Sequence, residues 1–165
     1  IQTMLGKTND TDEYSMMSIE DIVDMCNDFK ANHVVITGGE PCLYDLNKLT
    51  ATLLALGYTV QIETSGTQLI RCHAGTYITV SPKVNMAGGY DVLDASLKLA
   101  DEIKYPIGKI KDIALLKELL QKSPCDNIWL QPLSQNKSAT ALCVEQATIN
   151  NWRVSIQTHK FIGVR

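Results

Sequence analysis

The chain has 165 residues, of which 45% are hydrophobic and 20% charged, and its formal net charge is −3. This length suffices for one domain with a substantial buried core. The small negative charge gives no reason to expect a nucleic acid or an anionic membrane surface as a direct partner. No apolar run approaches the roughly 20 residues of a membrane span, and no secretory signal opens the chain.

Five cysteines are scattered along the chain without a CxxC pair: Cys26, Cys42, Cys72, Cys125 and Cys143. An odd, scattered set argues against a disulfide framework and is typical of a reducing compartment. We therefore expect a cytoplasmic protein. The chain begins with Ile1 rather than methionine, and we expect a segment upstream of it.

Residues 1–17 are polar and predict an irregular lead-in. Ser18 and Asp21 have the spacing of a capping box, which predicts the start of a helix. The apolar residues behind this box recur at helical spacing and predict a buried face that consists of Ile19, Ile22, Val23, Cys26 and Phe29.

A short, fully buried strand is predicted at Val34-Val35-Ile36, and Thr37-Gly38-Gly39-Glu40-Pro41 follows it directly. Two glycines at a strand end allow a sharp turn and let a ligand approach the backbone closely. Glu40 adds a carboxylate to this turn, and Pro41 stiffens its exit. One or two glycines are common in an ordinary strand-to-helix turn, but the full combination favours a ligand-binding turn.

Beyond this turn the chain alternates between helices and strands. Asp45 is predicted to cap a helix with an apolar stripe that consists of Leu46, Leu49, Leu53 and Leu56. Asp91 and Asp112 are predicted to cap two further helices, and another helix is predicted at about 138–150. Further strands are predicted at 59–62, 77–80, 102–105, 128–130 and 153–156.

Six strands separated mostly by helices predict an α/β fold with a parallel sheet, in a single domain that spans residues 1–165. The link between the second and third strands is too short for a full helix. Two architectures remain open, an open doubly wound sheet and a complete or partial barrel. Both bind their ligands at the C-terminal ends of the strands.

Polar clusters follow five of the predicted strands, with the sequences TGGEP, ETSGT, SPK, QPLS and QTHK. Their shared position favours one polar site, although ETSGT alone is better explained as a solvated loop. Lys83 could meet a carboxylate or lie in solvent, and His159 could donate to a substrate or lie on the surface. Glu40 and Glu63 could bind an amine or ribose hydroxyls, or instead cap a neighbouring helix or bind a nearby lysine. Inert packing explains Cys42 better than reactivity, and no pattern indicates a hydrolase or a zinc site.

The segments HVVITGGEPC, QIETSGT, VSPKVNM, EIKYPIG, LQPLSQ and QTHKFIG occur in this order. They resemble the 7-carboxy-7-deazaguanine synthase family of the radical S-adenosylmethionine (SAM) superfamily, which acts in queuosine and 7-deazapurine biosynthesis, a tRNA modification pathway. The resemblance implies a modified partial (β/α) barrel. It also implies a carbon–nitrogen lyase that converts 6-carboxy-5,6,7,8-tetrahydropterin to 7-carboxy-7-deazaguanine with loss of ammonia.

The resemblance further implies three cofactors, SAM, a [4Fe-4S] cluster and Mg²⁺. Matched by position, the SAM contacts are Gly39, Ser81, Pro82, Lys83, Gln131, Pro132, Leu133 and Ser134. Substrate contacts are implied for Thr37 and His159, whereas Arg165 departs from the family pattern. A reductant protein such as flavodoxin or ferredoxin is implied as a partner, and a homodimer is compatible with the resemblance.

The family holds its cluster with three cysteines in a CxxxCxxC loop, and the Asp-Thr after it supplies the magnesium site. These 165 residues contain no such loop. We expect the loop and the first strand of the barrel upstream of Ile1, so that the chain alone is inactive. The alternatives are another small radical SAM enzyme, such as a glycyl-radical activating enzyme, and a cluster-less relative that binds only SAM or a partner protein.

Overall fold

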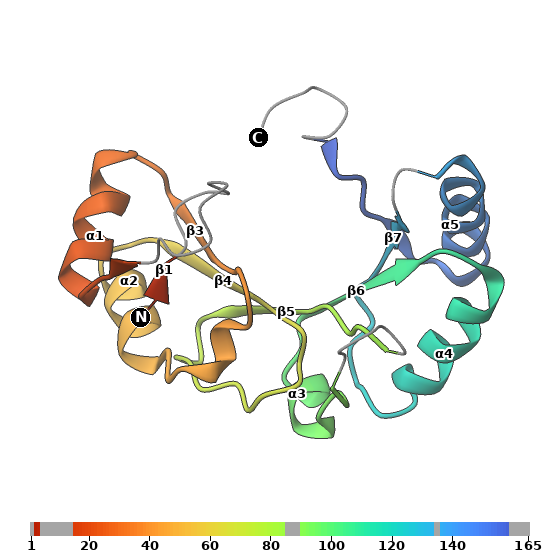
Figure 1. Cartoon of the computed structure of the whole chain (residues 1–165), viewed down its shortest axis with the longest axis horizontal. Helices are drawn as coiled ribbons and strands as arrows, with labels where there is room; N and C mark the ends of the chain where they lie inside the picture. The colour runs from red at the N-terminus through yellow and green to blue at the C-terminus, as the bar shows by residue number, and fades with distance from the viewer. Residues whose placement is uncertain (1, 4–14, 85–89, 134–135, 159–165) are drawn as a thin grey trace. The chain divides into compact units, whose positions relative to one another are not determined.

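The structure is a computed structural model that describes residues 2–3, 15–84, 90–133 and 136–158. It has an α/β fold with a small sheet and a six-stranded sheet (Figure 1). The small sheet pairs β1 (Gln2–Thr3) with β2 (Ser15–Met16) in antiparallel orientation. The prediction of an entirely irregular lead-in is therefore wrong at these four positions.

The six-stranded sheet has the strand order β3-β4-β5-β6-β7-β8. Parallel pairing joins β3 to β4, β5 to β6, β6 to β7 and β7 to β8. A doubly wound sheet reverses its strand order at a switch point, whereas this order follows the chain throughout. The order therefore favours the barrel-type alternative. The strands are β3 (His33–Ile36), β4 (Thr59–Thr64), β5 (Tyr77–Val80), β6 (Glu102–Ile107), β7 (Ile128–Pro132) and β8 (Arg153–Val154).

Most of the predicted helices form, with some changes at their starts. The capping box of α1 is confirmed, because the hydroxyl of Ser18 accepts the N–H of Asp21 at 3.0 Å while the Asp21 carboxylate accepts the N–H of Ser18 at 2.8 Å. The predicted caps at Asp45 and Asp91 are wrong: α2 and α3 start later, after Leu46 and Leu93. The helices are α1 (Ile19–Asp28), the 3₁₀ helix η1 (Pro41–Leu43), α2 (Asn47–Ala55), α3 (Asp94–Lys98), α4 (Ile110–Leu120) and α5 (Lys137–Asn150).

The chain forms two compact units. Unit 1 comprises residues 1–63 and 70–77, and unit 2 comprises residues 64–69 and 78–165. In unit 1, Leu49 and Leu53 of α2 pack with Val60 of β4 in the core. Leu56, which was predicted to belong to the same stripe, is 56% exposed, because α2 ends before it.

The strand β3 is less buried than its sequence predicts. Val35 is 43% exposed, and Val34 and Ile36 are half-buried. The helix α1 likewise has no fully buried residue, but its predicted apolar face is confirmed, because it packs against the core of unit 1 through Ile19, Ile22, Val23 and Cys26. Phe29, which was predicted to belong to this face, is 75% exposed. Val34 and Ile36 pack against the core of unit 1, whereas Val35 lies on the other face of β3.

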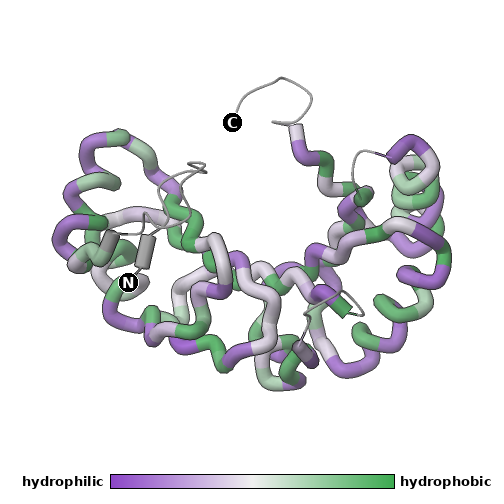
Figure 2. Tube along the Cα trace, in the orientation of Figure 1, coloured by the Kyte–Doolittle hydropathy of each residue, from purple (hydrophilic) through white to green (hydrophobic). Residues whose placement is uncertain are grey.

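In unit 2, side chains alternate regularly along β6: Ile103, Tyr105 and Ile107 are buried, and the residues between them are half-buried. This alternation is expected for a strand covered on one face. The helix α4 covers that face with Ile113, Leu116 and Leu119, and hydrophobic and hydrophilic segments follow one another along it (Figure 2). Within the described ranges, no helix has the length and hydrophobicity that crossing a membrane requires.

Candidate functional site

The turn after β3 presents its backbone openly, as its glycines predict. Gly38 and Gly39 have positive φ values of 86° and 45°, a region that favours glycine. A Cβ added at either position would meet nothing within 4 Å, so the space beside this backbone is free. Thr37, the predicted substrate contact, precedes them and is exposed. The turn can therefore offer peptide groups and one hydroxyl to a ligand.

Glu40 and Cys42 have structural tasks in the same turn. The Oε1 atom of Glu40 accepts the N–H of Cys42 at 3.0 Å and so caps the 3₁₀ helix η1. This bond supports helix capping, one of the roles considered for Glu40. Cys42 is only 2% exposed and packs with Leu46 and Ile62, which confirms the prediction that it is a packing residue.

An apolar cleft of about 500 Å³ lies beside this turn, within unit 1. Ile22 and Met25 of α1 and its C-cap residue Phe29 line this cleft. The lining also includes the strand β3, the turn itself, Leu46 and Leu49. Cys26 lines the cleft, and partial burial raises the pKa of its thiol. A neutral thiol adds to the apolar character of this cleft.

In unit 2, the predicted residues Ser81, Pro82 and Lys83 follow β5. The N–H of Ser81 donates to the carbonyl oxygen of Thr64 at 2.7 Å, which fixes the start of this segment. Pro82 is buried, and Lys83 is exposed. A rigid segment that ends in an exposed ammonium group is suited to an anionic part of a ligand.

The ETSGT segment mainly serves the fold. Gly66 has a φ of 76°, and a Cβ there would lie 2.8 Å from Cγ1 of Val80 and 3.1 Å from Cγ1 of Val92. The hydroxyls of Ser65 and Thr67 hydrogen-bond to each other at 2.9 Å. Gly66 is thus a packing residue, and none of residues 63–67 is exposed. The expectation that this segment is a solvated loop is therefore wrong.

Gln131, Pro132 and Leu133 lie at the end of β7 and are half-buried. Since β5, β6 and β7 pair in parallel, the carboxyl ends of these strands meet at one edge of unit 2. The structure therefore brings the predicted residues after β5 and β7 to the same edge. Two other predicted residues, Ser134 and His159, lie outside the described residues.

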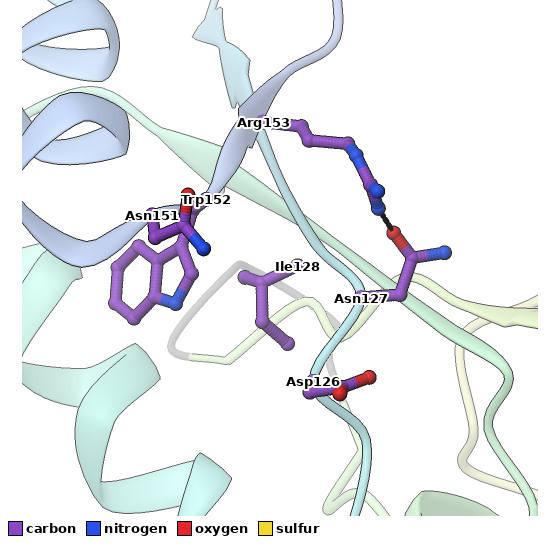
Figure 3. A pocket seen from close by; sticks show the side chains of 6 residues that line it. All are labelled: Asp126, Asn127, Ile128, Asn151, Trp152 and Arg153. Atoms are coloured by element: carbon purple, nitrogen blue, oxygen red, sulfur yellow. Dashed lines mark hydrogen bonds between the residues drawn. The ribbon is translucent and has the colours of Figure 1, made fainter.

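A second pocket, of about 440 Å³, lies at the opposite, amino ends of β7 and β8 (Figure 3). The Oδ1 atom of Asn127 accepts the Nε1–H of Trp129 at 3.1 Å and also an N–H of Arg153. The Arg153 guanidinium lies 5.6 Å from the centre of the Trp129 ring, within range of a cation–π contact. These contacts join the amino ends of the two strands and involve no predicted site residue.

The sequence prediction missed two residues next to the site, Gly108 and Asp112. One oxygen of the Asp112 carboxylate accepts the N–H of Gly108 at 2.8 Å and that of Lys109 at 2.9 Å. Gly108 in turn lies against Leu133. A glycine directly after a strand, with an acid four residues later, was the available signal. Asp112 was recognised only as a helix cap.

Comparisons with known proteins identify close relatives. The 7-carboxy-7-deazaguanine synthase of Escherichia coli K12 is 47% identical over 167 residues, which cover 98% of this chain and 75% of the relative. The synthase of Buchnera aphidicola (subsp. Schizaphis graminum) is 40% identical over 169 residues, with 99% and 75% covered. No model of a protein family matches the chain.

A solved structure agrees with this result. The crystal structure of QueE from Escherichia coli superposes with a TM-score of 0.85 at 48% identity and covers 93% of this chain and 69% of that one. The match confirms the predicted fold class, an α/β partial barrel of the radical SAM type. Given identities of 40–47% over nearly all its residues, the chain belongs to the 7-carboxy-7-deazaguanine synthase family.

Proposed function

We propose that the chain forms most of a radical SAM lyase that converts 6-carboxy-5,6,7,8-tetrahydropterin to 7-carboxy-7-deazaguanine with loss of ammonia. The observation that carries this proposal is the 47% identity with the Escherichia coli synthase over 98% of the chain. That identity favours a synthase over the two alternatives, a glycyl-radical activating enzyme and a cluster-less binding protein. The reaction belongs to queuosine biosynthesis, and we place the protein in the cytoplasm.

The described residues fit SAM. The open backbone of Gly39 offers carbonyl acceptors for the amino group of SAM, because no Cβ blocks the approach. Lys83 would provide a cation for the SAM carboxylate, and the family resemblance implies Ser81, Pro82 and the segment 131–134 as its other SAM contacts. Thr37 and His159 are proposed to contact the pterin. When bound, SAM and a [4Fe-4S] cluster supply the radical chemistry, and the protein's residues bind and orient the reactants.

The described residues do not fit the cluster. No group of three cysteine, histidine or acidic side chains that could hold a metal forms among them, although all five cysteines are described. We therefore propose that the cluster ligands and the Mg²⁺ site lie outside these 165 residues. We further propose that residues 1–165 belong to a single catalytic domain. A flavodoxin or ferredoxin is the proposed electron donor to the cluster, and a homodimer is the proposed assembly.

The test is turnover by the protein in its cluster-containing form. Incubation with SAM, a chemical reductant and 6-carboxy-5,6,7,8-tetrahydropterin is expected to yield 7-carboxy-7-deazaguanine and ammonia, both measured by mass spectrometry and a coupled assay. Cleavage of SAM without conversion of the pterin would contradict the proposed substrate. No SAM cleavage by a protein with a verified cluster would contradict the proposed enzyme class.

Lys83→Ala tests the binding surface separately. Loss of a charge-assisted hydrogen bond is expected to weaken SAM binding by about 10- to 100-fold, while the melting temperature changes little because Lys83 is exposed. Lys111→Ala, an exposed lysine on α4, is the matched control and should leave SAM affinity unchanged. Equal affinities for the wild type and Lys83→Ala would remove Lys83 from the site.

A further inference from the structure

The loop between β6 and α4 is anchored by a single carboxylate. The Oδ2 atom of Asp112, in the first turn of α4, accepts the N–H groups of both Gly108 and Lys109, at 2.8 and 2.9 Å. Hydrogen bonds from peptide N–H groups to a carboxylate are stronger than those to a neutral acceptor. Two such bonds from consecutive residues fix both the position and the orientation of this loop.

The Leu133 side chain leaves little room for a side chain at position 108. Its φ is not positive, since the described glycines with positive φ are Gly38, Gly39, Gly57 and Gly66. A Cβ at position 108 would instead lie 3.1 Å from Cδ1 of Leu133 and 3.9 Å from its Cγ. Such a distance is tighter than ordinary van der Waals contact, so the Leu133 side chain would have to move.

The backbone places these two residues side by side. Ile107 of β6 pairs with Pro132 of β7, so Gly108 and Leu133 are the next residues on two adjacent parallel strands. The carbonyl oxygen of Leu133 also accepts the N–H of Asn136, at 3.1 Å, and the Asn136 side chain caps α5. The hydrogen bond to Asn136 therefore fixes the Leu133 backbone, and the Gly108 backbone limits the position of the Leu133 side chain.

We propose that Gly108 and Asp112 are positioning residues of the SAM site. Asp112 anchors the loop, and the bare backbone of Gly108 sets the place of the Leu133 side chain. This inference rests on the proposed function, in which Leu133 contacts SAM. An apolar side chain suits the face of the nucleoside, and a displacement of even 1 Å weakens such a contact.

The first experiment is a double-mutant cycle on the cluster-containing enzyme, with SAM affinity measured by equilibrium dialysis. Gly108→Ala is expected to weaken SAM binding about three- to tenfold. Leu133→Ala should weaken it at least as much, and the double variant no more than Leu133→Ala alone, because both changes act through one side chain. The control is Gly75→Ala, whose Cβ would lie 3.4 Å from Leu54 Cδ1, an ordinary contact, and it should leave SAM affinity unchanged.

A second readout needs no ligand. In ¹³C-methyl NMR spectra of the chain, Gly108→Ala should shift the two Leu133 methyl resonances, which are assigned by their absence from the Leu133→Ala spectrum.

The role of Asp112 is tested by SAM binding. Asp112→Ala should weaken SAM binding as Gly108→Ala does. Asp112→Asn, which retains a carbonyl acceptor, should restore most of the affinity.

The outcomes distinguish the proposed SAM contact of Leu133 from the proposed positioning role of Gly108 and Asp112. If Leu133→Ala binds SAM like the wild type, the role proposed for Leu133 in the SAM site fails. If Leu133→Ala weakens binding but Gly108→Ala and Asp112→Ala do not, the positioning role is wrong and the SAM site stands. If Asp112→Ala lowers only the melting temperature, Asp112 is a structural cap and not a positioning residue.

Discussion

A buried hydroxyl without a partner lies in the short segment before β5. Thr76 is 5% exposed, and its Oγ1 atom makes no hydrogen bond within the described part of the chain. Thr50 offers a direct comparison, because it is also buried but its hydroxyl is satisfied. Its Oγ1 atom donates to the carbonyls of Leu46 at 2.9 Å and Asn47 at 3.1 Å, and it accepts the N–H of His73 at 2.9 Å. Two threonines of similar burial thus differ in whether the polar atom is satisfied.

Replacement of each threonine by valine, which has nearly the same shape, is expected to have opposite effects. Thr76→Val removes an unsatisfied polar atom and should raise the free energy of unfolding by about 1 kcal/mol. Thr50→Val removes the hydroxyl that donates to the carbonyls of Leu46 and Asn47 and leaves the His73 N–H without its acceptor, so it should lower that free energy by about 1–3 kcal/mol. Urea denaturation of both variants measures the difference. A loss of stability for Thr76→Val would show that its hydroxyl has a partner, such as a buried water.

At the level of the elements, apolar periodicity predicted most helices and strands correctly, because long amphipathic patterns such as that of α4 require burial of one face. Local cap signals were less reliable: Ser18 and Asp21 form their box, but Asp45 lies one residue before the N-cap of α2, although it accepts the N–H of Asn47 at 2.9 Å. The run Val34–Ile36 predicted burial on both faces, but neighbouring elements determine which side of a strand is covered.

The contacts of the site were harder to predict than its residues. The turn Thr37–Pro41 was recognised because glycines with positive φ leave a clear mark in the sequence. The packing of Gly108 on Leu133 depends on the register of β6 with β7, which the sequence does not display.

The helix α5 packs against β7 and β8 through small residues (Figure 1). Its buried positions are Ala139, Cys143 and Ala147, and Cys143 is 0% exposed. Burial raises the pKa of the Cys143 thiol from 9.0 to about 11. The folded chain therefore holds this thiol neutral at a pH where the unfolded chain ionises it.

This difference predicts a loss of stability in alkali. Below pH 9 the thiol is protonated in both states, and its contribution is fully present. Between pH 9 and about 11 the unfolded state releases the proton first, so the free energy of unfolding should fall as the pH rises. Cys143→Ala removes the group and should show a shallower decline in urea titrations across this range. Parallel curves for the two proteins would contradict the raised pKa.

At the scale of the whole molecule, the five thiols are dispersed through both units. Cys42 and Cys143 are buried, and the other three are half-buried. Burial raises the pKa of Cys26, Cys125 and Cys143, which disfavours the thiolate form that iron requires as a ligand. No three of the cysteines come together in a metal-binding group within the described residues, and the raised pKa of these three thiols also does not suit a cluster.

A protein limited to these 165 residues is therefore expected to assemble no [4Fe-4S] cluster and to release no 5′-deoxyadenosine from SAM. The same protein extended by a segment with a CxxxCxxC loop should do both, because three thiolates from one loop can meet at one site. Iron and sulfide content and 5′-deoxyadenosine yield are measured side by side after anaerobic reconstitution. Should the 165-residue protein bind about four irons, its own cysteines would be the ligands, and serine variants of the five would identify them. That result would overturn the proposed location of the cluster ligands.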